Sequence, residues 1–201
     1  MAKGKILTGF SKPYVATYSY ASSTVTYASG QQLARGVQVA LNINTADESI
    51  FYADNVAAES APGIFTDGTC DLTVDGLLNA AEKLILGLPT PATKTVGSDT
   101  VDIYNYGDSM EPPYVGIGFI ARYQQDGVES YVPVILPKCR FKAPSLSAAT
   151  QAEAIDWQTQ ELSANIFRDD TANHNWKMMA EDQTSEADAE AVIKAIFGIT
   201  T

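Results

Sequence analysis

The sequence predicts an α+β fold, mainly of antiparallel strands, in a single domain that spans residues 1–201. Most segments with a regular pattern alternate larger apolar side chains with smaller or polar ones at period two, which is typical of half-buried strands. Only two segments show the spacing of an amphipathic helix, and no repeat or low-complexity linker divides the chain. With 201 residues, 45% of them hydrophobic, the chain can bury a core without disulfides.

The first third of the chain predicts three strands followed by a long loop. Tyr14 to Tyr20 and Ser22 to Ala28 are expected to be neighbours joined by a short turn. Gly36 to Ile43 is expected to be a half-buried strand. Its apolar face consists of Val37, Val39, Leu41 and Ile43. After the short apolar run Ile50 to Tyr52, residues 53–69 show little periodicity, and loops of this length are usually functional or disordered. Apolar residues in this loop would dock either on a partner or on their own domain, and the sequence leaves both open.

The middle of the chain changes from strand to helix. Cys70 to Val74 predicts a strand. Asp75 to Leu86 predicts an amphipathic helix with Asp75 as its N-cap, and Gly87 with Pro89 ends it. Pro89 to Ser98, rich in Pro, Thr and Gly, predicts a loop.

The second half of the chain predicts five more strands and a final helix. The strand segments are Val101 to Tyr106, Val115 to Tyr123, Glu129 to Leu136, Lys138 to Lys142, and Leu162 to Arg168. The turn at Gln124–Gly127 makes the second and third of these a hairpin, and Gly116 with Gly118 indicates a close backbone approach. Glu186–Phe197 predicts a helix capped by Ser185.

Composition excludes several classes of partner. The chain has 24 acidic and 13 basic residues, a net charge of −11, which disfavours binding to nucleic-acid phosphates and to anionic membranes. Cys70 and Cys139 stand alone, so we expect buried free thiols and no zinc site. No signal peptide and no apolar run of about 18 residues is present, so we expect a protein that is made in a cytosol and stays soluble.

The sequence offers no support for catalysis. His174 is the single histidine and lies in a polar turn without a nucleophile motif around it. Gly116-Ile117-Gly118 lacks the third glycine and the following helix of a phosphate-binding loop, and no acidic segment matches a calcium loop. We therefore assign no catalytic, cofactor-binding or metal-binding residue, and we expect a structural or binding role rather than an enzyme.

Several segments in order resemble the major tail proteins of long, non-contractile-tailed bacteriophages. The resemblance covers nearly the whole chain, and it depends on the order and spacing of pieces that are individually unspecific. The segments that show it are Ile50 to Asn55; Glu59; Phe65; Gly68 to Asp75 with the helix ending Ile85-Leu86-Gly87; Gly116 to Phe119; Tyr131; Leu136 to Phe141; and Glu161 to Ala164.

The resemblance implies a tail-tube-type β-sandwich or barrel with a flanking helix, a virion protein that assembles in the bacterial cytoplasm. Its subunits would form hexameric rings that stack around a tape-measure protein and end at tail terminator and tip proteins. Viral DNA would pass through the lumen without specific binding, and carboxylates would be concentrated on lumen-facing strands. No cofactor or membrane is implied.

The resemblance further implies that the long loop around 53–69 reaches an adjacent ring. The candidate inter-ring contact residues are Phe51, Tyr52, Asp54, Asn55, Ile64 and Phe65. The alternative function is a β-sandwich module that binds carbohydrate or another ligand in adhesion.

Overall fold

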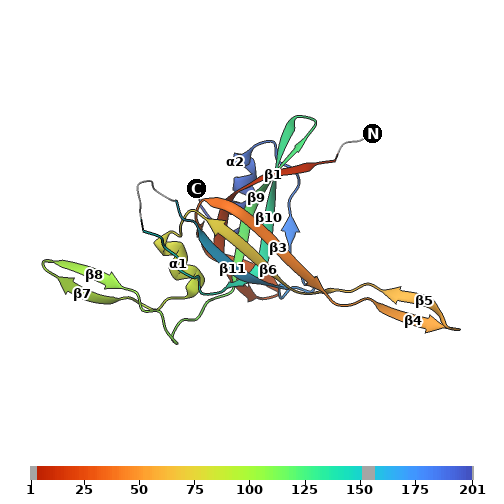
Figure 1. Ribbon diagram of the computed structural model, residues 1–201, viewed down its shortest axis with the longest axis horizontal. Helices are drawn as coiled ribbons and strands as arrows, with labels where there is room; N and C mark the ends of the chain where they lie inside the picture. The colour runs from red at the N-terminus through yellow and green to blue at the C-terminus, as the bar shows by residue number, and fades with distance from the viewer. Residues whose placement is uncertain (1–3, 151–156, 201) are drawn as a thin grey trace.

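The computed structural model describes residues 4–150 and 157–200 and contains one large antiparallel sheet, two separate hairpins and two helices (Figure 1). The strands of the large sheet are β1 (Ile6–Ala21), β2 (Thr24–Gln32), β3 (Gly36–Thr45), β6 (Phe65–Val74), β9 (Val115–Gln125), β10 (Val128–Phe141), β11 (Gln160–Phe167) and β12 (Met178–Met179). They follow the order β2-β1-β9-β10-β11-β6-β3, and β12 pairs with β10 beside β11. The predicted α+β class with mainly antiparallel strands is confirmed.

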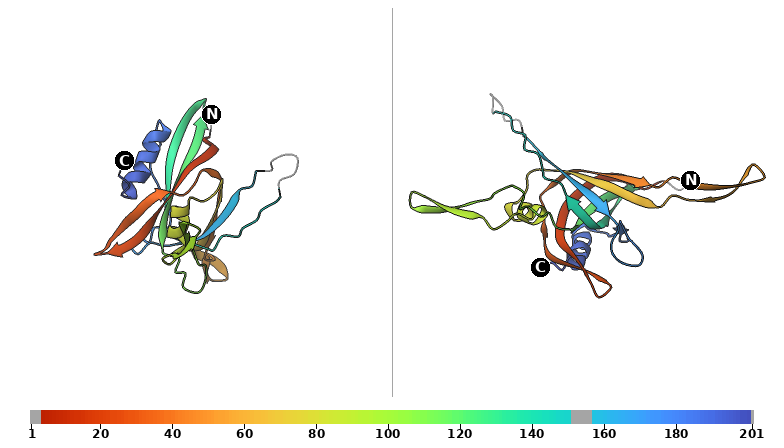
Figure 2. Two further views of the ribbon diagram at one scale, coloured as in Figure 1. Left: turned by 90° about the vertical axis from the view of Figure 1, so that its left-hand side faces the viewer. Right: turned by 90° about the horizontal axis from the view of Figure 1, so that it is seen from below.

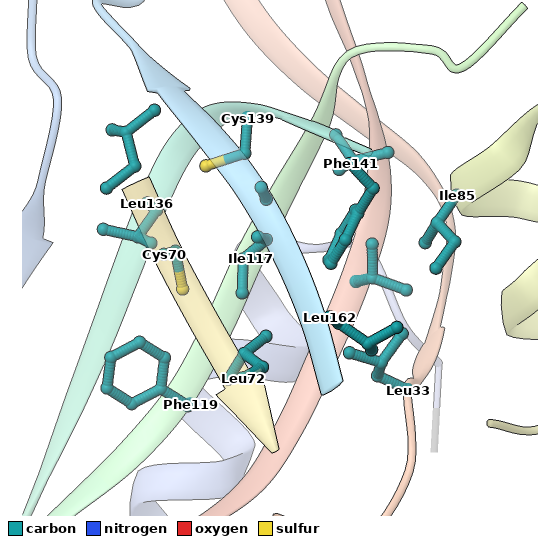
Figure 3. Packing of buried hydrophobic residues seen from close by; sticks show 14 of the residues in the cluster. Leu33, Cys70, Leu72, Ile85, Ile117, Phe119, Leu136, Cys139, Phe141 and Leu162 are labelled. Carbon is teal, nitrogen blue, oxygen red and sulfur yellow. The ribbon is translucent and has the colours of Figure 1, made fainter. Parts of the chain in front are cut away.

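The large sheet curls until its two ends approach each other. β3 lies against β1, yet the two strands form no ladder within the described residues, so the sheet stays open. The inner face collects alternate residues of five strands into one apolar core. Figure 3 shows part of this core, with Cys70 and Leu72 from β6, Leu162 from β11, and Ile117 and Phe119 from β9.

Helix α2 (Glu186–Ile196) covers the outer face of β1, β9 and β10 (Figure 2). Ala189, Ile193 and Phe197 form its buried side. They pack against the strand positions that point away from the main core, so β9 is buried on both faces over residues 115–121. The predicted cap is confirmed, because Ser185 Oγ accepts a hydrogen bond of 3.1 Å from the Asp188 N–H.

Helix α1 (Asn79–Leu86) is shorter than predicted. The expected start at Asp75 is wrong, because the Asp75 carboxylate accepts hydrogen bonds from the backbone and guanidinium of Arg35. Leu78 is the N-cap residue and makes no side-chain cap, whereas Gly87 ends the helix in the left-handed conformation as predicted.

The predicted hairpin between β9 and β10 is confirmed, with Asp126 and Gly127 at positive φ in its turn. Two predicted strands, Glu129–Leu136 and Lys138–Lys142, are one strand, β10, interrupted only by a register shift between Leu136 and Cys139. In β3 a similar shift follows Gly36, and Val37 is therefore 57% exposed instead of facing the core with Val39, Leu41 and Ile43.

Two predicted loops are wrong, because both contain hairpins. Residues 53–69 include β5 (Val56–Ala61), which pairs with β4 (Ser49–Ala53), and the beginning of β6. Residues 89–98 include β7 (Ala92–Val96), which pairs with β8 (Asp99–Ile103). Neither hairpin belongs to the large sheet.

Candidate intermolecular contact site

The β4–β5 hairpin, residues 49–61, projects from one end of the molecule as an arm (Figure 1). Its turn residues Asp54 and Asn55 have φ of 51° and 65°, the left-handed pair that a two-residue hairpin turn requires. Every residue of both strands is exposed, so no other part of the subunit covers the β4–β5 arm. A two-stranded hairpin is marginally stable by itself in water, and a partner surface would stabilise this one.

Both faces of the β4–β5 arm carry large apolar side chains. Cross-strand partners share a face, and a register shift between Phe51 and Tyr52 sets which residues these are. One face presents Phe51, Ala53, Val56 and Glu59, and the opposite face presents Ile50, Tyr52, Ala57 and Ser60. Phe51, Tyr52 and Val56 are between 62% and 66% exposed.

The structure brings four of the six candidate contact residues together on this arm: Phe51, Tyr52, Asp54 and Asn55. Ile64 lies at the base of the arm and is 65% exposed. Phe65 does not belong to this surface, because it is buried. Its ring stacks on Trp176 with a centroid separation of 5.0 Å, and its carbonyl oxygen accepts a hydrogen bond from Arg168.

The β7–β8 arm, residues 92–103, is a second arm. The predicted strand Val101–Tyr106 overlaps its strand β8, whereas β7 lies in the segment that was predicted to be a loop. The register gives the hairpin two faces of different character, because apolar and polar residues alternate along both strands. Nearby Pro and Gly residues make this alternation hard to recognise in the sequence. One face is polar and presents Thr93, Thr95, Thr100 and Asp102. The other is mainly apolar and presents Ala92, Lys94, Val96, Asp99, Val101 and Ile103. The large apolar side chains of this face are between 42% and 63% exposed; they are Val96, Val101 and Ile103.

The two arms leave opposite ends of the molecule, on either side of the curled sheet (Figures 1 and 2). Their exposed apolar faces are therefore separated by the whole body of the subunit. An apolar surface of this kind on a water-exposed hairpin is typical of a protein–protein contact.

The outer face of β3, β6 and β11 is a polar surface without a helix over it. Asn42 Nδ2 donates to the Asp71 carboxylate at 3.0 Å, Asn44 Nδ2 donates to that of Asp67 at 2.7 Å, and Ser163 Oγ donates to that of Asp71 at 2.8 Å. A cavity of about 450 Å³ opens at the α1 end of this face, and Asp71, Lys142 and Glu161 are among its lining residues.

The carboxylates of the chain are not concentrated on this polar face. Asp67, Asp71 and Glu161 lie there, whereas other acidic residues lie on both arms, in loops and along α2. The charge distribution alone therefore does not identify a surface that faces DNA.

The two cysteines and the single histidine lie in ordinary core and turn environments. Burial, with a smaller contribution from the nearby Asp71 charge, raises the pKa of the Cys70 thiol to about 12, and burial raises the pKa of Cys139 as well. Both cysteines are buried and free, as predicted. His174 is an exposed turn residue with φ of 52°, in the loop that encloses Asp169.

The part of the chain that the structure describes contains neither a metal centre nor a membrane-spanning helix. Over residues 4–150 and 157–200, no three His, Cys, Asp or Glu side chains are grouped to bind a metal ion. Within the same ranges, no helix has the length and apolar character needed to cross a membrane.

Comparison with protein-family models gave no match, and a search of curated proteins gave none either.

Proposed function

We propose that this protein is the structural subunit of a bacteriophage tail tube, which self-assembles into hexameric rings that stack into a channel for genome delivery. The single observation that supports this most is the pair of uncovered apolar arms at opposite ends of the subunit. A subunit that works alone gains nothing from such arms, whereas a subunit that stacks on its neighbours can bury them.

Burial of the arms can offset the cost of assembly. Full burial of a Val or Phe side chain contributes about 1.5–3 kcal/mol, and the β4–β5 arm exposes Ile50, Phe51, Tyr52 and Val56 together. Association costs about 4–15 kcal/mol in lost translational and rotational freedom. Several such contacts for each ring would offset that cost, because the subunits of a ring dock together rather than one at a time.

The open sheet also suits a ring. β2 and β3 are its terminal strands, and each leaves one edge without a ladder partner among the described residues. Free edges promote aggregation in a monomer, and closed cyclic assembly can remove them.

We assign the polar outer face of β3, β6 and β11 to the lumen. The carboxylates on that face would repel DNA phosphates, and its Asn42 and Asn44 amides already donate hydrogen bonds to those carboxylates. Viral DNA would therefore pass without specific binding. In this proposal the other partners are the tape-measure protein, around which the tube forms, and the tail terminator and tip proteins. The subunit is assembled in the bacterial cytoplasm and resides in the virion tail.

Electron microscopy and sedimentation of the purified protein test the proposal. We expect rings or hollow tubes, alone or with the tape-measure protein, and we expect Phe51→Ser combined with Tyr52→Ser to lower the assembled fraction at least about tenfold. Leu146→Ser is the matched control, since Leu146 is 91% exposed but lies on neither arm.

One outcome would contradict the proposed function, and a second would contradict only the assignment of the stacking contact. A wild-type protein that stays monomeric in every condition and binds glycans on an array would favour the adhesion-module alternative. Tubes that form equally well from the Phe51 and Tyr52 variant would show that the β4–β5 arm is not the stacking contact.

A further inference from the structure

We propose that the β4–β5 arm of one subunit packs on the apolar face of the β7–β8 arm of the next subunit, with Glu59 of one arm paired to Lys94 of the other. This inference rests on the proposed self-assembly and names the two surfaces that meet. The partner of each arm is thus an arm of a second copy of this chain.

The two faces match in character. The Phe51 face of the β4–β5 arm offers Phe51 and Val56 beside one carboxylate, Glu59, directly across from Phe51. The apolar face of the β7–β8 arm offers Val96, Val101 and Ile103 beside one ammonium group, Lys94, directly across from Val101. Face-to-face packing of two hairpins therefore places apolar groups together and can bring Glu59 of one arm close to Lys94 of the other.

Neither charge has a partner among the described residues of its own subunit. Over the described residues, Glu59 and Lys94 take part in no ion pair and no side-chain hydrogen bond. The β4–β5 arm and its approach contain Asp47, Glu48, Asp54 and Glu59 but no Lys or Arg from residue 46 to 61. A cation that pairs with Glu59 must therefore come from outside this arm, and Lys94 lies on the exposed apolar face of the other arm. Asp99 shares this face, across from Val96 beside the turn and diagonal to Lys94, and the two side chains form no ion pair within the described residues.

The position of the arms requires a second subunit. They project from opposite ends of the molecule, so the two faces cannot meet within one chain (Figure 1). Between successive copies in the same orientation they can meet, and the contact is then heterologous, with a different surface contributed by each partner.

Charge reversal tests the pairing. Glu59→Lys and Lys94→Glu should each place like charges at the contact and raise the protein concentration needed for assembly by about tenfold. The double variant restores the opposite signs and should return that concentration to within about threefold of wild type. Asp102→Lys is the control, because Asp102 lies on the polar face of the same arm and should have little effect.

Cross-linking gives an independent readout. One preparation carries Phe51→Cys and a second carries Val101→Cys, and a short bis-maleimide should link them only when both are present in one assembly. Thr100→Cys replaces Val101→Cys in the control, since Thr100 lies on the opposite face. The native thiols of Cys70 and Cys139 are buried and should not react.

The outcomes separate this inference from the proposed function. If the wild-type protein never assembles, both are overturned. If it assembles but the double variant is not rescued, or Thr100→Cys links as readily as Val101→Cys, then the subunits associate through other surfaces and only the arm pairing is overturned.

Discussion

At the residue scale, Glu190 is the charged group that fastens α2 to the large sheet. Its carboxylate accepts hydrogen bonds from Tyr14 Oη at 2.6 Å and, in an ion pair of 2.8 Å, from Lys194 Nζ, and it also binds the ammonium group of Lys12. Partial burial alone would raise the pKa of Glu190, but the contacts with Lys12, Lys194 and Tyr14 outweigh it and lower the pKa from 4.5 to about 2. Lys12 reaches this site from a left-handed backbone position, φ 49°, at a register shift in β1.

This pKa shift predicts acid sensitivity. The folded-state pKa lies below the unfolded value, so the stabilisation is complete above pH 4.5 and is lost as the pH falls toward about 2. Glu190→Gln should lower the free energy of unfolding by about 1.5–3 kcal/mol at pH 7, and the difference from wild type should shrink as the pH falls through that window.

Urea unfolding of both proteins between pH 7 and pH 3 measures the effect. Glu181→Gln is the control, since Glu181 is exposed and lies outside the Glu190 cluster. A Glu190→Gln penalty that stays constant across the pH range would contradict the assignment.

At the element scale, the seating of α2 depends on two glycines of β9. A Cβ atom at Gly116 would lie 2.5 Å from Tyr27 Cε1, and one at Gly118 would lie 2.8 Å from Ile193 Cγ2 and 2.9 Å from Phe197 Cε2. The Phe197 ring occupies the space that side chains would otherwise fill, and it packs edge-on to Tyr27 with centroids 5.0 Å apart. The close approach expected at these glycines is made by side chains and not by another backbone segment.

Gly118→Ala should therefore push α2 from the sheet and lower the free energy of unfolding by about 1–3 kcal/mol. Chemical denaturation followed by tryptophan fluorescence or circular dichroism measures the loss. Gly107→Ala should change stability by no more than about 0.5 kcal/mol, because a Cβ at Gly107 meets nothing within 4 Å. Equal free energies of unfolding for Gly118→Ala and wild type would contradict this prediction, because the added methyl group would then be accommodated without displacing α2 at a cost.

The arms should behave differently from the rest of the fold. Their backbone hydrogen bonds are exposed to water and have no core above them, so their amides should exchange rapidly in the isolated subunit. In the assembled state we expect exchange in residues 49–61 and 92–103 to slow at least about tenfold, which hydrogen–deuterium exchange mass spectrometry measures. Equal rates in both states would place the arms outside every subunit contact.

The elements that the sequence predicts well are those that pack on their own core. β9 and α2 have regular apolar periods because each buries a definite face, and the turn at Asp126-Gly127 has a strong local signal. The arms lack such a period. Ile50-Phe51-Tyr52 places apolar groups on both faces, and the turn at Asp54-Asn55 has no glycine to mark it.

The candidate contact was likewise predictable only in part. Phe51 and Tyr52 follow from the resemblance to tail proteins, and both lie exposed on the β4–β5 arm. Phe65 has the same residue type and a nearby position, but only the fold shows that Trp176 covers it. The apolar face of the β7–β8 arm was missed because threonines alternate with its valines and lysine, which leaves a weak hydropathy signal.

At the scale of the whole molecule, the net charge of −11 has several separate effects. Carboxylates such as Glu190 and Asp170 form ion pairs that hold elements together, and those of Asp67 and Asp71 are held by amides and hydroxyls on the polar face. Four more, on or beside the β4–β5 arm, disfavour contact between two such arms, because like charges would meet. In the proposed assembly, charge would therefore help to determine which ends of two subunits join.

The placement of unlike arms at opposite ends of the subunit has a consequence for growth. A filament built through the proposed arm pairing would have a direction, with free β4–β5 arms at one terminus and free β7–β8 arms at the other. The two termini of such a filament would be chemically different, so we expect their elongation rates to differ. A capping surface that fits one kind of arm would not fit the other, so blocking growth at both termini would require two different capping surfaces.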